Sequence, residues 1–254
     1  MPFSKSNNRK VPDWLLSKPI AHRGFHNITE GVPENSSAAF SLCRAHNLPI
    51  ELDIQLSKDG HPVVMHDTSL LRTTGQNTDV SVLTLTEICA LTLEQTNEKV
   101  PALTHVLKQI NGKVPLVIEI KSADHNKQNY IRAVVTALDG YTGPIAIQSF
   151  DPFLMMELRR QRPDIIRGQL GMSMPPAHLN AARRYIVKSM PFLRNVKADY
   201  VAYDVAGLQS GRITRLRKRG YPILAWTVDT VDKLAAAKVS ADNIIFEKLP
   251  LDEL

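Results

Sequence analysis

Cysteine is scarce in this chain of 254 residues, which contains only Cys43 and Cys89. Two thiols so far apart offer neither the ligand spacing of a zinc site nor the disulfide framework of a small secreted protein. Long apolar runs are also missing, since no stretch approaches the ~18 uninterrupted apolar residues of a spanning helix. The N-terminus MPFSKSNNRKVPDWLL is polar and basic and lacks the apolar segment of a secretion signal. These absences predict a cytoplasmic protein without stable membrane insertion.

Aromatic residues make up only 6% of the chain and are not interleaved with the basic residues, which disfavours nucleic-acid binding. Lysine and arginine number 31 against 25 aspartates and glutamates, and the formal net charge is +6. A basic surplus of this kind suits an anionic membrane surface or a phosphate-bearing small molecule, and charge alone does not choose between them. The sequence gives no indication of the oligomeric state.

Short apolar, β-branched runs alternate with segments of helical periodicity along the chain. This alternation is typical of a parallel α/β architecture, and eight such units in 254 residues predict a (β/α)8 barrel, or TIM barrel. No linker or low-complexity tract interrupts the pattern, so we expect one domain over residues 1–254. The predicted strands are Ile20–Gly24, Ile50–Ile54, Leu116–Lys121, Ile145–Phe150, Ile166–Leu170, Tyr200–Asp204, Ile223–Thr227 and Asn243–Glu247.

A long stretch separates the second predicted strand from the third. We interpret it as a small insertion over roughly residues 55–115. It contains a strand-like segment, Pro62–His66, and a helix-like segment, Thr86–Leu93.

Polar residues gather at the C-terminal ends of the first three predicted strands. The connecting loops of a barrel meet at this end and form the active site. The three clusters are His22-Arg23-Gly24, Glu51-Leu52-Asp53 and Glu119-Ile120-Lys121. Because side chains alternate along a strand, the first and third residues of the last two clusters share a face, which we expect to point into the active site.

Three carboxylates held together in a partly buried site repel one another, and a hard divalent cation relieves that repulsion. The sequence therefore predicts a Mg²⁺ or Ca²⁺ site at Glu51, Asp53 and Glu119. Histidines can transfer protons near neutral pH, and arginine and lysine can bind a phosphate. The residues available for these two tasks are His22 and His66 for protons, and Arg23 and Lys121 for phosphate. Together they indicate phosphoryl transfer.

Seven segments of the sequence resemble the glycerophosphodiester phosphodiesterase family, in its bacterial single-domain form, and they follow one another in the family's order. They span the chain from about residue 20 to residue 250. The segments are His22-Arg23-Gly24, Pro33-Glu34-Asn35-Ser36, Glu51-Leu52-Asp53-Ile54, Asp59-Gly60-His61-Pro62-Val63-Val64-Met65-His66-Asp67, Glu119-Ile120-Lys121, Ser149-Phe150-Asp151 and Ala225-Trp226-Thr227-Val228-Asp229.

The resemblance implies a barrel with an insertion after the second strand and metal-dependent hydrolysis of glycerophosphodiesters to glycerol 3-phosphate and an alcohol. It implies that the three carboxylates hold the metal and that His22 and His66 act as general acid and base. By the same analogy, Arg23 and Lys121 bind the phosphate. Glu34 is expected near the metal or the substrate, and Trp226 is expected to line the pocket.

Two features depart from the family pattern and bear on the choice of alcohol. The closing strand ends in Phe246-Glu247 where the family usually has Thr-Asp, and Asp229 stands where the family often has Asn. Which histidine acts as the acid and which as the base stays open. The choice between attack by water and formation of a cyclic phosphate also stays open.

Two other functions compete with this interpretation. One is a lysophospholipase D-like activity on a lipid, for which segment His178–Asn195 would supply a surface-seeking helix. The other is a catalytically silent barrel that binds a phosphorylated metabolite. The silent barrel is disfavoured because every residue assigned to the chemistry is present.

Overall fold

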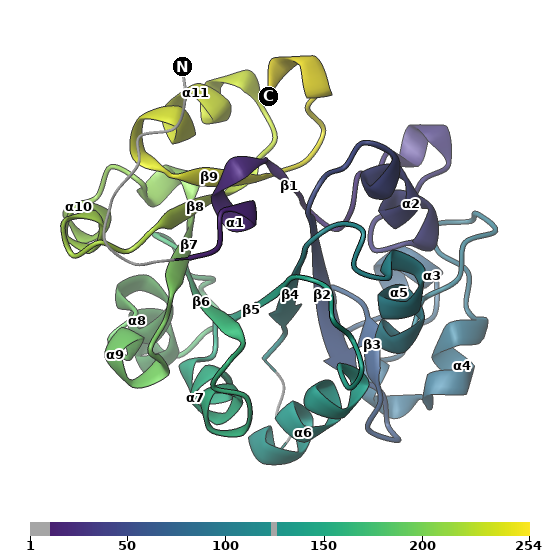
Figure 1. Ribbon diagram of the computed structural model, residues 1–254. Coiled ribbons are helices and arrows are strands. Elements are labelled where there is room, and N and C mark those ends of the chain that lie inside the picture. The colour runs from purple at the N-terminus through teal and green to yellow at the C-terminus, as the bar shows by residue number, and fades with distance from the viewer. Residues whose placement is uncertain (1–10, 123–125) are drawn as a thin grey trace. The chain divides into compact units, whose positions relative to one another are not determined.

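The computed structural model describes residues 11–122 and 126–254 (Figure 1). The basic N-terminal segment 1–10, part of the stretch used to predict a cytoplasmic protein, lies outside the described residues. Backbone contacts divide the described chain into two compact units. The N-terminal unit comprises residues 21–145, and the C-terminal unit comprises residues 11–20 and 146–254.

The N-terminal unit is built around β2 (Ile50–Leu56), a strand in which every residue is buried. β2 is parallel to β1 (Ile20–Ala21) and to β4 (Leu116–Ile120), and antiparallel to β3 (Pro62–Val64). Its main helices are α2 (Ser37–Ala45), α5 (Leu103–Ile110) and α6 (Lys127–Ala137), with α2 packed against α5. Local signals start these helices: Ser36, for example, caps α2 by accepting a hydrogen bond from the backbone N–H of Ala39.

The segment between β2 and α5 has a small apolar core of its own. It contains β3, α3 (Leu71–Thr74), a 3-10 turn at Val80–Val82, and α4 (Leu85–Ala90), which begins with a capping box between Thr84 and Glu87. The buried residues of this core are Val63, Met65, Leu70, Val80, Ile88, Leu93 and Val100. Burial of Met65 in this core fixes the backbone next to His66.

The C-terminal unit contains five parallel strands that pair in chain order. They are β5 (Ile145–Ser149), β6 (Ile166–Gly171), β7 (Tyr200–Asp204), β8 (Ile223–Val228) and β9 (Asn243–Phe246). Its helices are α1 (Trp14–Ser17), α7 (Pro152–Gln161), α8 (Ala181–Ser189), α9 (Leu193–Val196), α10 (Gly211–Lys218) and α11 (Val231–Ser240).

Eight parallel strands alternate with helices along the described chain, which is the (β/α)8 barrel fold that the sequence predicted. All eight predicted strands are present, and β3 and α4 match the strand-like and helix-like segments after the second strand. No helix of residues 11–122 or 126–254 has the length and apolar character needed to cross a membrane.

Two elements differ from those predicted from the sequence. β1 ends at Ala21, because Arg23 and Gly24 have φ angles of 56° and 80°, which no strand can continue. The segment proposed as one surface-seeking helix forms two helices, α8 and α9, because Met190 adopts a left-handed φ of 45° between them.

Gly24 must lack a side chain because of both its φ and its packing. A Cβ here would lie 2.8 Å from Ala39 Cβ and 3.0 Å from Phe40 Cδ1. We expect Gly24→Ala to lower the free energy of unfolding by about 1–3 kcal/mol more than Gly60→Ala in urea titrations. Gly60 is the matched control, since its φ of 79° is similar but nothing lies within 4 Å of its Cβ position. Equal effects of the two substitutions would show that α2 moves away at no cost.

Candidate active site

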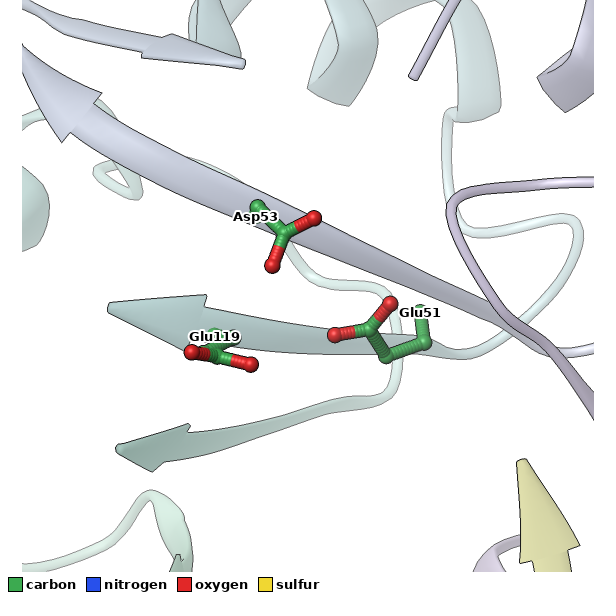
Figure 2. Close-up of side chains that lie close together, drawn as sticks. All are labelled: Glu51, Asp53 and Glu119. Atoms are coloured by element: carbon green, nitrogen blue, oxygen red, sulfur yellow. The ribbon is translucent and has the colours of Figure 1, made fainter. Parts of the chain in front are cut away.

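The three predicted carboxylates lie together in the N-terminal unit. Glu51 and Asp53 alternate along β2, and Glu119 stands opposite Asp53 on the neighbouring parallel strand β4. Figure 2 shows the three carboxyl groups on these two strands. All three residues are buried, and one ligand atom from each lies within 4.8 Å of the others. Strand alternation and strand register together therefore create a compact cluster of oxygen ligands.

The chemistry of this cluster suits a hard divalent cation. Burial, together with the charges of Asp53 and Glu119, raises the pKa of Glu51 well above its usual value. Burial likewise raises the pKa of Glu119, and Asp53 adds to the effect. Oxygens on opposite sides of a bound ion are about 4 Å apart for Mg²⁺ and about 5 Å apart for Ca²⁺, so the observed spacing accommodates either ion with small movements. The buried acidic triad could therefore hold a metal ion.

Lys121 contacts two of these carboxylates. Its Nζ lies 2.9 Å from Asp53 Oδ1 and 2.8 Å from Glu119 Oε1. Burial disfavours the charged ammonium group, but the two carboxylates outweigh burial and raise the pKa of Lys121. Burial would likewise raise the pKa of Asp53, but Lys121 and the other nearby cationic groups lower it. Lys121 therefore stays charged beside the ligand cluster.

Arg23 connects the cluster to the start of α2. Its Nη1 donates to Glu34 Oε1 at 2.8 Å, its Nε lies 3.4 Å from Asp53 Oδ2, and its backbone N–H donates to Glu51 Oε2 at 3.2 Å. The left-handed φ of Arg23 allows its backbone and side chain to contact different carboxylates. Lys121 and Arg23 offset two of the three negative charges of the ionised triad, and a bound divalent ion would outweigh the third.

His66 lies two residues after the end of β3, on a backbone that is held from two sides. The N–H of Met65 donates to the carbonyl of Asp53 at 3.0 Å. Gln55 Nε2 donates to the carbonyls of His66 and Asp67 at 3.1 and 2.5 Å. His66 Nδ1 is 2.5 Å from Asp67 Oδ1. Burial lowers the pKa of His66 despite the opposing effect of Asp53, which favours the neutral imidazole needed by a general base.

His22 follows β1 directly and reaches the same group of charges. In its protonated form, His22 is one of the residues whose charge lowers the pKa of Asp53. All predicted site residues from His22 to Lys121 therefore lie in the N-terminal unit.

Four residues support the site without having been predicted. Asn35 Nδ2 donates to Asp53 Oδ2 at 3.0 Å, and Gln55 Nε2 donates to the His66 carbonyl. Asp67 contacts His66, and Arg72 contacts Glu34. Gln55 continues the alternation of Glu51 and Asp53 along β2, so the strand periodicity carried a signal for it. Glu34 accepts hydrogen bonds from two arginines, Arg23 and Arg72.

Trp226 belongs to the C-terminal unit, near the end of β8. Its ring packs edge-on against Phe150, with ring centroids 5.5 Å apart. Its indole Nε1 is buried without a hydrogen-bond partner among the described residues. The two departures from the family pattern lie in this unit as well: Asp229 pairs with Lys233 at 2.6 Å, and Glu247 pairs with Lys248 at 3.1 Å.

Comparisons with known proteins agree on one family. The model of the Glycerophosphoryl diester phosphodiesterase family matches residues 22–249. A glycerophosphodiester phosphodiesterase of Caldanaerobacter subterraneus subsp. tengcongensis is 32% identical over 242 residues, which cover 89% of this chain and 92% of the relative. Another, from Bacillus subtilis, is 26% identical over 254 residues, which cover 89% of this chain and 80% of the relative.

Solved structures share the fold. A phosphodiesterase of Oleispira antarctica, in complex with the product sn-glycerol-3-phosphate, superposes with a TM-score of 0.76 at 23% identity. The match covers 92% of this chain and 93% of that structure. The family model and the relatives show that this chain belongs to the glycerophosphoryl diester phosphodiesterase family, whose members are phosphoric diester hydrolases.

Proposed function

We propose that the chain hydrolyses glycerophosphodiesters to glycerol 3-phosphate and an alcohol in a metal-dependent reaction. The observation that carries the proposal is the buried triad of Glu51, Asp53 and Glu119, with ligand atoms within 4.8 Å of one another. Two cations and a histidine backed by an aspartate lie beside it. The bound product of the Oleispira antarctica phosphodiesterase supports glycerol 3-phosphate as the released phosphate ester.

In this proposal the three carboxylates would hold Mg²⁺ or Ca²⁺. A bound ion would supply positive charge close to where negative charge develops on the phosphoryl group. Arg23 and Lys121 bind the phosphate, Arg23 through its planar guanidinium group and Lys121 as a point charge. Glu34 fixes Arg23 through their 2.8 Å hydrogen bond, and Trp226 keeps the substrate-binding role that the family resemblance implies.

His66 acts as the general base. The Asp67 carboxylate can only accept hydrogen bonds, so the neutral His66 ring carries its proton on Nδ1 and leaves Nε2 free to take a proton. The proton comes from the attacking hydroxyl, either of water or of the substrate glycerol. His22 is the acid that protonates the departing alcohol oxygen. The glycerol route passes through a cyclic phosphate, which ³¹P NMR would detect during turnover.

We propose that residues 1–254 act as one barrel domain in the cytoplasm. The two cysteines support a reducing compartment, since both Cys43 and Cys89 are free thiols.

The proposed activity predicts release of glycerol 3-phosphate from glycerophosphocholine and glycerophosphoethanolamine. We expect EDTA to abolish release and added Mg²⁺ or Ca²⁺ to restore it, because the buried carboxylates need a counter-ion. An enzyme-coupled assay of glycerol 3-phosphate measures both steps. Release that persists at full rate after complete metal removal would refute metal dependence, and no release from either substrate with any metal would refute the substrate class.

A lipid substrate is a second candidate, and one observation favours it. Segment 172–198 contains five basic residues and no acidic residue. The outward face of α8 carries Arg184, Tyr185 and Lys188, and Met174 in the preceding loop is 79% exposed. Exposed aromatic and basic residues on one helix face are typical of contact with an anionic membrane.

Flotation with phosphatidylserine vesicles tests this lipid hypothesis. A membrane-binding segment would carry the protein to the top of the gradient, and the double variant Arg184→Ser, Lys188→Ser would stay at the bottom. The matched control is Arg215→Ser, Lys218→Ser on α10, another basic helix of the same unit. Wild-type protein that stays at the bottom would remove this candidate.

A further inference from the structure

Arg72, on the short helix α3, uses three nitrogens of its guanidinium group to bind two different carboxylates. Its Nη1 and Nη2 donate to Glu34 Oε2 and Oε1 at 3.0 and 2.7 Å. Its Nε donates to Asp67 Oδ2 at 2.5 Å. The hydrogen bonds from Arg72 outweigh the effect of burial, lowering the pKa of Glu34 and lowering that of Asp67 to about 2. Both carboxylates are therefore ionised at neutral pH.

Each of these carboxylates in turn holds a residue of the proposed chemistry. The second oxygen of Asp67 faces His66 Nδ1 at 2.5 Å. Glu34 Oε1 accepts from both Arg72 and Arg23, and Arg23 Nε lies 3.4 Å from Asp53 Oδ2. A continuous chain of polar contacts thus runs from His66 through Arg72 to Arg23 and ends at a carboxylate of the triad.

We infer that Arg72 is a positioning residue, which fixes the ring of His66 and the guanidinium group of Arg23 relative to each other. The assignment of chemical roles to His66 and Arg23 rests on the proposed function, but the positional link does not. Arg72 touches neither residue directly, so it acts through Asp67 on one side and through Glu34 on the other.

The backbone of α3 is well placed to hold Arg72 still. Leu70 and Thr73, on either side of the exposed Leu71 and Arg72, are buried. Thr73 Oγ1 lies 3.4 Å from the sulfur of Met65, the residue that precedes His66. α3 and the His66 loop therefore pack on the same apolar core, and the guanidinium group bridges from that core to Glu34.

Lysine cannot replace Arg72 in this arrangement. A guanidinium group donates along fixed directions to two carboxylates at once, whereas an ammonium group is a single point charge. An ordinary exposed ion pair would tolerate Arg72→Lys, since such pairs contribute little and depend mainly on charge. Arg72→Lys therefore separates a positioning role from a purely electrostatic one.

Steady-state kinetics with glycerophosphocholine test the contacts of Arg72 with Asp67 and with Glu34. We expect Arg72→Gln to lower kcat by about 10–100-fold and also to raise KM, and we expect Arg72→Lys to recover only part of the loss. Asp67→Asn should lower mainly kcat, and Glu34→Gln should raise mainly KM. Because Arg72 acts through Asp67, the double variant Arg72→Gln, Asp67→Asn should have the kcat of Asp67→Asn alone.

Arg44→Gln is the matched control for these kinetics. Arg44 is another exposed arginine of the N-terminal unit, and its Nη1 donates to the carbonyl of Gln109 on α5. We expect its kcat and KM to equal those of the wild type. Full activity in Arg72→Lys, or losses in the double variant that multiply, would overturn the inference.

A spectroscopic measurement keeps the inference testable apart from the chemistry. In protein labelled with ¹⁵N-histidine, we expect the neutral His66 ring to carry its proton on Nδ1 in the wild type and to exchange between tautomers in Arg72→Gln. An unchanged His66 spectrum in Arg72→Gln would overturn the inference. A changed spectrum with unchanged kcat would support the positional link and refute instead the proton-transfer role proposed for His66.

Discussion

Replacing Glu51 with glutamine should lower kcat/KM for a glycerophosphodiester by at least on the order of 10³-fold, since a metal ion supplies several kcal/mol of transition-state stabilisation. The same substitution should not destabilise the metal-free protein. Burial and the nearby Asp53 and Glu119 charges raise the pKa of Glu51, so its negative charge is unfavourable without a counter-ion. Glutamine keeps the shape of the side chain and removes that charge.

Thermal unfolding with and without metal distinguishes this explanation from simple misfolding. A ligand that binds only the folded protein raises Tm, so Mg²⁺ or Ca²⁺ should raise Tm of the wild type and have a much smaller effect on Glu51→Gln. Glu87→Gln is the control, because Glu87 caps α4 and has no part in the triad. Near-normal turnover of Glu51→Gln, or a metal-induced rise in Tm equal to that of the wild type, would refute the predicted metal site.

Asp53→Asn should behave differently from Glu51→Gln although both residues belong to the triad. Asp53 is buried and lies near two half-buried cations, with Lys121 Nζ at 2.9 Å and Arg23 Nε at 3.4 Å. Loss of its charge leaves these cations without their common partner, and removing one partner of a buried ion pair costs up to about 3–5 kcal/mol. We therefore expect Asp53→Asn to lower the free energy of unfolding in urea titrations, where Glu51→Gln does not.

The carboxylate cluster could be predicted because it depends on two regular features. Alternation along β2 places Glu51 and Asp53 on one face, and parallel strands of a barrel present their C-terminal ends at the same side. The position of Glu119 opposite Asp53 follows from the register between β2 and β4. These relations are periodic, so the order of residues in the chain is enough to find them.

Arg72 could not be predicted in the same way. It lies 38 residues from Glu34 in sequence, and their contact depends on how the segment between β2 and α5 folds on its own core. Asn35 and Arg23 are also difficult to place, since their contacts depend on left-handed φ angles of 54° and 56°. Irregular backbone and tertiary packing determine this part of the site, and neither leaves a periodic pattern in the sequence.

Replacing His66 with glutamine should lower kcat by about 10²–10⁴-fold, the range expected when a general base is removed. The wild-type kcat/KM should decrease on the acid side, because only the neutral ring can accept a proton. Burial lowers the pKa of His66, so activity is present above that pKa and is lost as pH falls through it, below the ordinary histidine value of about 6.5. A pH series of kcat/KM measures this acid limb.

The contact with Asp67 makes the pH series more specific. Asp67 raises the pKa of His66, opposing burial, so Asp67→Asn should shift the acid limb to lower pH while also reducing the maximum rate. His61→Gln is a matched control, since His61 is an exposed histidine just before β3 and carries no assigned role. An acid limb that persists unchanged in His66→Gln would assign the base to another residue. His22, whose charge also acts on Asp53, would then be the first to test.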